Sequence, residues 1–167
     1  MVGQLACSPE MSGRIAAFAP VSGAFREDFE GPCYPSRTTI PMLELHVGSD
    51  HTINYTGGPG LGDRGNTVPV PQWLQQWAQR DQCDSTNKTV ELTDAAGKNN
   101  VNRTTWTCGG KPGVVSHYFS GSLGHVWPTE ENTGYNATSV IMRFFNTLYF
   151  PGAHSGKTRS ARESKLR

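Results

Sequence analysis

The sequence lacks any long hydrophobic run, and neither sign of charge is in clear excess. No apolar stretch approaches the roughly 20 residues of a membrane-spanning helix, which indicates a chain outside the membrane. The sequence has fifteen basic and fourteen acidic residues, for a net charge of +1, so its charge favours neither nucleic acid nor a membrane as a partner. Residues 1–7 also lack the basic start and long apolar core of a signal peptide.

Cysteine is scarce but even in number, and acceptor sites for N-glycosylation are frequent. Four cysteines fit two disulfides formed in an oxidising compartment. The Asn-x-Thr pattern occurs at four asparagines, Asn54, Asn87, Asn102 and Asn136. Both features predict a secreted, extracellular glycoprotein. Because an exported protein needs a leader, we expect the native N-terminus to lie upstream of Met1.

Three apolar runs predict strands of one α/β domain. Ile15–Val21 is apolar without alternation, as in a strand of a parallel sheet that is covered on both faces. Met42–Val47 and Gly113–Phe119 predict two further strands. We expect the domain to occupy residues 1–151. Residues 152–167 are basic and carry few apolar side chains, so we expect a disordered tail there.

Caps and prolines predict the helices. Met1–Ser8 has residues at helical spacing and ends where a proline follows. A second helix is predicted from Val70 to about Arg80, with a proline in its first turn and tryptophans on its apolar face. Asn136 predicts the cap of a third helix over Ser139–Asn146, which should pack against the sheet.

Two connecting regions have signals of their own. Thr89–Leu92 and Thr104–Thr107 predict a hairpin whose loop covers residues 94–100. Gly57–Gly62 is rich in glycine, but it neither follows a strand directly nor opens a helix. It therefore predicts a flexible lid rather than a phosphate-binding loop.

Two chemically capable side chains each follow a predicted strand. Asp50 comes after Met42–Val47 in a Gly-Ser turn, and His125 follows Gly113–Phe119 in the sequence Gly-His-Val-Trp-Pro. A hydrolase triad needs an imidazole to take the proton of a serine and a carboxylate to orient and stabilise that imidazole. The order Asp then His also matches the α/β-hydrolases, in which the nucleophile precedes both.

Four ordered blocks of sequence carry a resemblance to a known family. They are residues 18–23 (Phe-Ala-Pro-Val-Ser-Gly), 45–50 (Leu-His-Val-Gly-Ser-Asp), 77–83 (Trp-Ala-Gln-Arg-Asp-Gln-Cys) and 124–128 (Gly-His-Val-Trp-Pro). In this order they resemble the secreted α/β-hydrolases of the feruloyl esterase, acetylxylan esterase and polyhydroxybutyrate depolymerase group, most of all fungal feruloyl esterases. The similarity runs from about residue 1 to residue 151.

The resemblance implies a cofactor-free serine esterase that releases ferulic acid from feruloylated polysaccharides of plant cell walls. It places Asp50 at the triad acid and His125 at the triad base. Together with the order of the cysteines it favours the disulfides Cys7–Cys33 and Cys83–Cys108, one of three possible pairings.

The nucleophile of that family lies in a Gly-x-Ser-x-Gly elbow, and this pentapeptide does not occur in the sequence. The nearest match, residues 120–124, begins with serine and lies after Asp50, so neither Ser120 nor Ser122 is taken as the nucleophile. The resemblance places the elbow just before the helix over Met1–Ser8. We therefore expect a C-terminal portion of an α/β-hydrolase, without the N-terminal strands and the elbow. Because a triad without its serine loses about 10⁶-fold in turnover, we expect this chain alone to be inactive.

Other interpretations stay open. Among esterases, acetylated polysaccharide or polyhydroxybutyrate could replace feruloyl esters as the substrate. A non-catalytic carbohydrate-binding protein or a remnant of a hydrolase would instead use exposed tryptophans as stacking platforms, with candidates at Trp73, Trp106 and Trp127. A metal site built from His46, Asp50 and His51 would need a fourth ligand.

Overall fold

The computed structural model describes residues 1–26, 33–60, 62, 65–92, 101–121 and 123–149. Its helices are α1 (Val2–Cys7), α2 (Pro9–Arg14), α3 (Val70–Arg80), α4 (Glu130–Thr133) and α5 (Ala137–Tyr149). Its strands are β1 (Met42–Val47), β2 (Gly58–Pro59), β3 (Asn66–Thr67), β4 (Cys83–Leu92), β5 (Val101–Cys108) and β6 (Lys111–Ser120). The predicted α/β class is thus confirmed in its broad sense, as helices packed on a mixed sheet.

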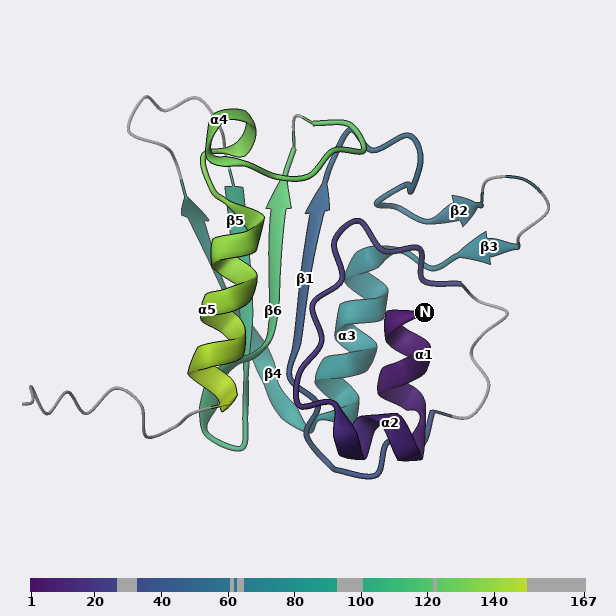
Figure 1. Ribbon diagram of the computed structural model, residues 1–167, viewed down its shortest axis with the longest axis vertical. Coiled ribbons are helices and arrows are strands. Elements are labelled where there is room, and N and C mark those ends of the chain that lie inside the picture. The colour runs from purple at the N-terminus through teal and green to yellow at the C-terminus, as the bar shows by residue number, and fades with distance from the viewer. Residues whose placement is uncertain (27–32, 61, 63–64, 93–100, 122, 150–167) are drawn as a thin grey trace, which may run out of the picture.

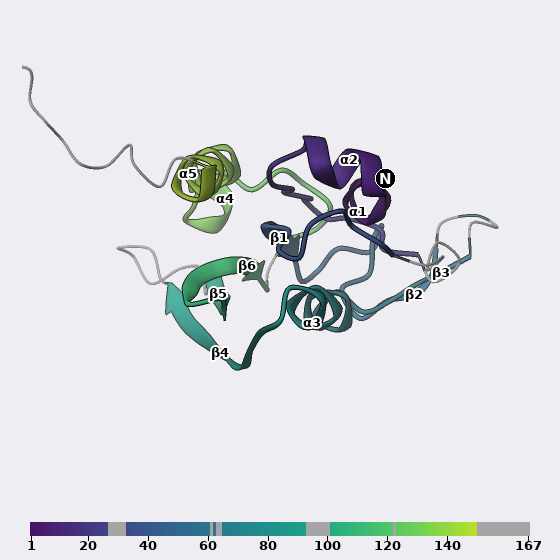
Figure 2. The ribbon, with the colours of Figure 1, turned by 90° about the horizontal axis from the view of Figure 1, so that it is seen from below.

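The main sheet has the strand order β1-β6-β5-β4. β1 and β6 are parallel, with Met42 opposite Val115 and Val47 opposite Ser120, whereas β5 is antiparallel to both of its neighbours. β1 and β6 lie side by side at the centre of the molecule (Figure 1). Seen along the sheet, α3 covers one face and α5 the other (Figure 2). Every residue of β1 is accordingly buried, while most of β4 is exposed.

The predicted strand over Ile15–Val21 forms only in part. Two isolated parallel bridges connect this segment with β1. The carbonyls of Phe18 and Pro20 accept the N–H groups of Leu43 and Leu45 at 2.9 and 3.1 Å. Pro20 has no N–H to return to β1, so the ladder is interrupted at that residue and the segment stays irregular.

Helix α2 is not predicted by the sequence, because Pro9 looks like the end of α1. The structure shows that Ser8 ends α1 and at once caps α2, its hydroxyl oxygen accepting the Met11 N–H at 3.4 Å. Pro9 takes the first turn of α2, where its missing N–H has no partner to lose. One proline therefore both stops one helix and starts the next.

The two long helices are confirmed, although α5 extends beyond the predicted Ser139–Asn146 at both ends. α3 buries the apolar face of Val70, Trp73, Leu74, Trp77 and Ala78 against one side of the sheet. α5 begins after Asn136, whose side-chain oxygen accepts the Ser139 N–H at 3.1 Å, and it packs Val140, Ile141 and Phe144 near Leu43 and Leu45 of β1. In the described part of the chain, no helix is long and apolar enough to cross a membrane.

The predicted hairpin is confirmed, but its strands are longer than the sequence indicates. β4 and β5 pair from Cys83 opposite Cys108 to Leu92 opposite Val101, and the predicted loop at 94–100 lies outside the described residues. The two predicted disulfides, Cys7–Cys33 and Cys83–Cys108, are both present, and each joins cysteines about 25 positions apart. Each contributes roughly 3 kcal/mol in the chain-entropy model. The short helix α4 is not predicted, and the predicted tail is outside the described part.

The lid predicted over Gly57–Gly62 falls only partly within the described residues. Gly58 and Pro59 pair with Asn66 and Thr67 to form a two-residue antiparallel ribbon, β2–β3. Gly57 has a φ of +73°, and a Cβ there would lie 2.5 Å from the Thr67 carbonyl oxygen. Glycine is thus required at this position for close backbone approach.

A buried carboxylate at the end of α3 yields a prediction about stability. Asp81 is only 4% exposed, and its Oδ1 accepts the Ile40 N–H at 3.0 Å. Burial raises the pKa of Asp81 to about 7, although the Ile40 N–H, Arg37 and Arg80 oppose the shift. The unfolded chain releases this proton near pH 4 and the folded chain near pH 7, so folding stability falls across that interval.

Asp81→Asn is therefore expected to stabilise the protein at pH 8 by about 1 kcal/mol, or a few degrees in Tm, because the amide oxygen still accepts the Ile40 N–H without a buried charge. Thermal melts of both proteins at pH 4 and pH 8 check this. A variant that melts at or below the wild-type temperature at pH 8 would contradict it.

Candidate functional site

The parallel pair β1–β6 brings Asp50 and His125 to one edge of the sheet. Asp50 follows the end of β1 and His125 follows the end of β6, and parallel strands end at the same edge. The two loops are joined by backbone hydrogen bonds, from Gly48 N–H to the Ser120 carbonyl at 2.7 Å and from Ser49 N–H to the Leu123 carbonyl at 3.0 Å. The predicted acid and base are thus neighbours in space.

His125 and Asp50 form a short hydrogen bond. His125 Nδ1 lies 2.7 Å from Asp50 Oδ2, and the Asp50 residue is only 3% exposed. The other carboxylate oxygen, Oδ1, accepts two backbone N–H groups, from Thr52 at 2.9 Å and Ile53 at 2.8 Å. The carboxylate is therefore fixed at both oxygens and points one of them at the imidazole.

These contacts keep Asp50 ionised. Burial alone would raise the pKa of Asp50, but the Ile53 N–H, the His125 imidazole and the Thr52 N–H outweigh burial and hold that pKa below its usual value. A carboxylate at Nδ1 selects the imidazole tautomer that carries its proton on Nδ1. The lone pair of His125 is then on Nε2, and 46% of this side chain is open to solvent. That is the arrangement of a general base.

The loop after His125 presents apolar side chains. Val126 is 48% exposed and Trp127 is 51% exposed. The backbone behind them is anchored, because Asn132 Nδ2 donates to the Trp127 carbonyl at 3.1 Å and Asn132 also forms a capping box with Thr129 at the start of α4. An apolar, partly rigid surface thus adjoins the imidazole.

Beneath Asp50 lies a polar cluster in which Glu44, His46 and His117 are buried and Tyr55 is half-buried. Glu44 and His117 are opposite each other in the β1–β6 register, and His46 shares the face of Glu44 because side chains two apart in a strand point the same way. Glu44 Oε1 lies 3.0 Å from His46 Nδ1, and Glu44 Oε2 lies 2.8 Å from His117 Nδ1. The carboxylate is therefore enclosed between two imidazoles.

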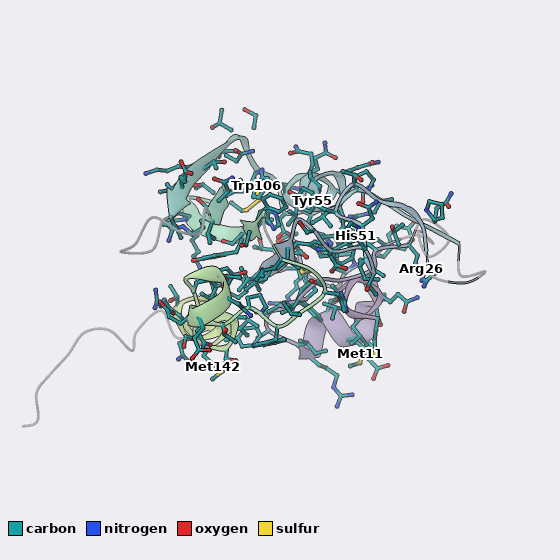
Figure 3. All side chains as sticks on the ribbon, turned by 90° about the horizontal axis from the view of Figure 1, so that it is seen from above. Met11, Arg26, His51, Tyr55, Trp106 and Met142 are labelled. Carbon is teal, nitrogen blue, oxygen red and sulfur yellow. A yellow bond between two sulfur atoms is a disulfide. The ribbon has the colours of Figure 1, made fainter. Side chains whose placement is uncertain are left out.

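Tyr55 covers the outer side of this cluster. Its hydroxyl lies 3.1 Å from His117 Nε2, while His117 Nδ1 donates to the Glu44 carbonyl oxygen at 3.1 Å. The Tyr55 ring also packs against Phe119, with ring centroids 4.4 Å apart. Figure 3 looks onto this end of the sheet and shows Tyr55 and His51 near the middle of the molecule, with Met142 at the outer side of α5.

The charges within the cluster stabilise each other. Burial by itself raises the pKa of Glu44, but hydrogen bonds and charge from His117 and His46 hold that pKa below its usual value. For His46 burial lowers the pKa, and the Glu44 carboxylate outweighs burial so that the pKa is raised. Both shifts favour an ion pair of Glu44 and His46. Burial and the charge of Glu44 also raise the pKa of Tyr55 to about 12.

The other residues singled out from the sequence lie as follows. The acceptor asparagines Asn54, Asn87 and Asn102 are exposed, whereas Asn136 is half-buried and caps α5. His51 is exposed beside Asp50, and His46 lies within β1, as the sequence predicts. Both ring nitrogens of His46 are hydrogen-bonded, to Glu44 and to the Ile53 carbonyl, which leaves neither for a metal. Over the described residues, no group of three or more His, Cys, Asp or Glu could hold a metal ion.

Sequence reasoning missed Glu44, His117 and Tyr55. A signal for the first two was present: a glutamate and a histidine two positions apart in an otherwise apolar run, and a second histidine in the next apolar run. Polar residues within buried strands need partners, so their coincidence indicates contact across strands.

No family model matches the chain, and no curated protein sequence matches it.

Proposed function

We propose that this chain carries the acid and the base of a serine esterase with an α/β-hydrolase fold, Asp50 and His125. The observation that carries the proposal is the 2.7 Å hydrogen bond between His125 Nδ1 and a buried carboxylate whose other oxygen is held by two backbone N–H groups. Neither a turn cap nor a surface histidine requires both features. Adjacent parallel strands that end in acid and base support the same assignment.

The chemistry follows from this geometry. His125 Nε2 takes the proton of the serine hydroxyl as its oxygen attacks the ester carbonyl, and Asp50 stabilises the imidazolium that forms. His125 then gives that proton to the departing alcohol, which leaves an acyl-enzyme. Water then attacks the acyl-enzyme, with His125 again acting first as base and then as acid, and the carboxylic acid product is released. The resemblance places the nucleophilic serine in an elbow N-terminal to α1, and we propose that the serine of this esterase lies in such an elbow.

We propose feruloyl esters of plant cell-wall polysaccharides as the substrate. The exposed Trp127 and Val126 beside His125 suit an aromatic acyl group better than an acetyl group, since an aromatic ring can stack on indole. Acetylated xylan and polyhydroxybutyrate are the alternative substrates. Two disulfides and the exposed acceptor sites Asn54, Asn87 and Asn102 support an extracellular location.

A purely carbohydrate-binding role has less support. Of the tryptophans considered as stacking platforms, Trp73 and Trp106 are buried in the core, and only Trp127 is exposed. One platform is a small area for a polysaccharide. Nor would such a role require the buried carboxylate behind His125.

The test begins with the coding sequence upstream of Met1. We expect it to continue in frame through a Gly-x-Ser-x-Gly elbow, and we call the product of this longer frame the extended protein. The extended protein should hydrolyse methyl ferulate, whereas the 167-residue chain should not exceed the rate of buffer. An alkyl acetate assayed in parallel separates feruloyl from acetyl specificity.

The matched control is the extended protein with the elbow serine replaced by alanine. It should lose roughly six orders of magnitude in turnover while keeping its fold. An extended protein that lacks the elbow, or that is folded but inactive on feruloyl, acetyl and hydroxybutyrate esters, would refute the esterase proposal.

A further inference from the structure

A continuous series of contacts links the buried Glu44 to the exposed imidazole of His125. Glu44 Oε1 lies 3.0 Å from His46 Nδ1, and His46 Nε2 lies 3.0 Å from the Ile53 carbonyl oxygen. The Ile53 N–H donates to Asp50 Oδ1 at 2.8 Å, and Asp50 Oδ2 accepts from His125 Nδ1 at 2.7 Å. Ile53 is thus held through both of its backbone polar groups, by His46 on one side and by Asp50 on the other.

The direction of these hydrogen bonds is fixed by chemistry. A carbonyl oxygen only accepts, so His46 Nε2 must donate to Ile53. The Glu44 carboxylate likewise accepts from His46 Nδ1, and both side chains are fully buried. His46 therefore has no lone pair to offer as a base, and its ring orientation is set on one side by Glu44. The role left for His46 is to hold the turn from Asp50 to Ile53 through its bond to the Ile53 carbonyl.

We propose that His46 is a positioning residue: braced by Glu44, it fixes the turn from Asp50 to Ile53 and thereby aims the Asp50 carboxylate at His125. The role of Asp50 as triad acid rests on the proposed function, but the positioning itself does not require ester hydrolysis. His46 Nε2 is also 4.0 Å from Asp50 Oδ2, so His46 supports the same carboxylate electrostatically.

His117 supplies a matched control inside the same cluster. Like His46, His117 is buried and lies close to the Glu44 carboxylate, with its Nδ1 2.8 Å from Glu44 Oε2. Its other nitrogen contacts the Tyr55 hydroxyl, not the Asp50–Ile53 turn. Replacing either histidine with leucine removes one imidazole from Glu44 and leaves it the other. Only the His46 replacement removes the bond to Ile53.

The experiment uses NMR on the 167-residue chain, with two observables. One is the downfield proton of His125 Nδ1, which reports the bond to Asp50. The other is the exchange rate of the Thr52 and Ile53 amides, which Asp50 protects. His46→Leu is expected to abolish or broaden the first signal and to speed amide exchange at least tenfold, whereas His117→Leu should preserve both. If His46→Leu keeps the signal, or if both variants lose it equally, the proposal is wrong.

A second variant covers the case in which His46→Leu does not fold. Glu44→Gln combined with His46→Leu removes both charges together, and such neutral replacements of a buried ion pair are often tolerated. The same loss of signal and protection is expected from it. If neither variant folds, His46 is a requirement of the whole fold rather than a positioning residue, and the proposal is refuted.

The extended protein gives a kinetic reading of the same idea. His46→Leu should lower kcat for methyl ferulate by up to about 100-fold with little change in KM, because misalignment of the acid affects the transition state more than binding. If the NMR effects are found but the wild-type extended protein hydrolyses no ester, the positioning stands and the esterase proposal fails. An equal loss in His117→Leu would contradict positioning by His46.

Discussion

Asp50→Asn is expected to lower kcat for methyl ferulate in the extended protein by about 10⁴-fold while leaving the fold intact. The asparagine oxygen can still accept the Thr52 and Ile53 N–H groups that hold Asp50 Oδ1 in the structure. Its amide nitrogen would then face His125 Nδ1 and donate to it. The imidazole would shift its proton to Nε2 and could no longer accept one from serine. Stopped assays at pH 7 with circular dichroism of each variant measure both effects.

His51→Ala is the matched control for Asp50→Asn. His51 lies next to Asp50 in the same turn, but its side chain is exposed. Its replacement should change kcat by less than a factor of about two. A variant Asp50→Asn that stays within tenfold of the wild type would show that Asp50 is not the triad acid, whatever its distance from His125.

Glu44→Ala is expected to lower the free energy of unfolding by about 3 to 5 kcal/mol, because it breaks a buried ion pair by removing one partner. The change removes the carboxylate that lies 3.0 Å from His46 and 2.8 Å from His117, in a cluster with almost no access to water. His46 Nδ1 loses its acceptor, whereas His117 Nδ1 keeps the backbone carbonyl oxygen of residue 44 and loses only the neighbouring charge. The strand pair also gains a void. Urea denaturation at pH 6 measures the difference, and full loss of cooperative unfolding is within the expected range.

The surface pair Glu10–Arg14 provides the comparison. Its side chains are more than two-thirds exposed and lie 3.1 Å apart on α2. Glu10→Ala should cost no more than about 0.5 kcal/mol, because water screens an exposed pair. If Glu44→Ala costs as little as Glu10→Ala, the buried cluster does not stabilise the fold.

The pH dependence of the Glu44 effect has a defined sign. The pKa of Glu44 is lowered on folding, so its contribution is present above the unfolded value of about 4.5 and is lost as pH falls through the folded value. The pKa of His46 is raised, so its contribution is full below the unfolded value of about 6.5 and is lost as pH rises through the folded value. The penalty of Glu44→Ala should therefore be greatest between about pH 4.5 and 6.5.

The elements that the sequence predicts well are those with a strong local pattern. Met42–Val47 is apolar at four of its positions and becomes β1 with the predicted bounds. The apolar face and early proline of Val70–Arg80 likewise define α3. Where the pattern is local but ambiguous, prediction fails: Pro9 both ends α1 and starts α2, and only the backbone geometry at Ser8 shows this.

In the candidate site, too, the residues with a local signal could be predicted and those brought together by strand pairing could not. Asp50 and His125 could be singled out because each follows an apolar strand in a glycine turn, and the structure places them 2.7 Å apart. The cluster beneath them could not be derived, because the meeting of Glu44 with His117 depends on the parallel register of β1 and β6. That register is set by packing on both faces of the sheet rather than by any single segment.

The pairing of β1 with β6 also has a kinetic side. Asp50 and His125 are 75 positions apart in the chain, and α3 and the β4–β5 hairpin lie between them. Contacts of such sequence separation close a long loop and form slowly compared with helices and hairpins. We therefore expect Asp50 and His125 to come together late in folding, with the Cys83–Cys108 disulfide shortening the loop that must close. During refolding, recovery of the His125 signal should track the slowest phase of the chain rather than its early collapse.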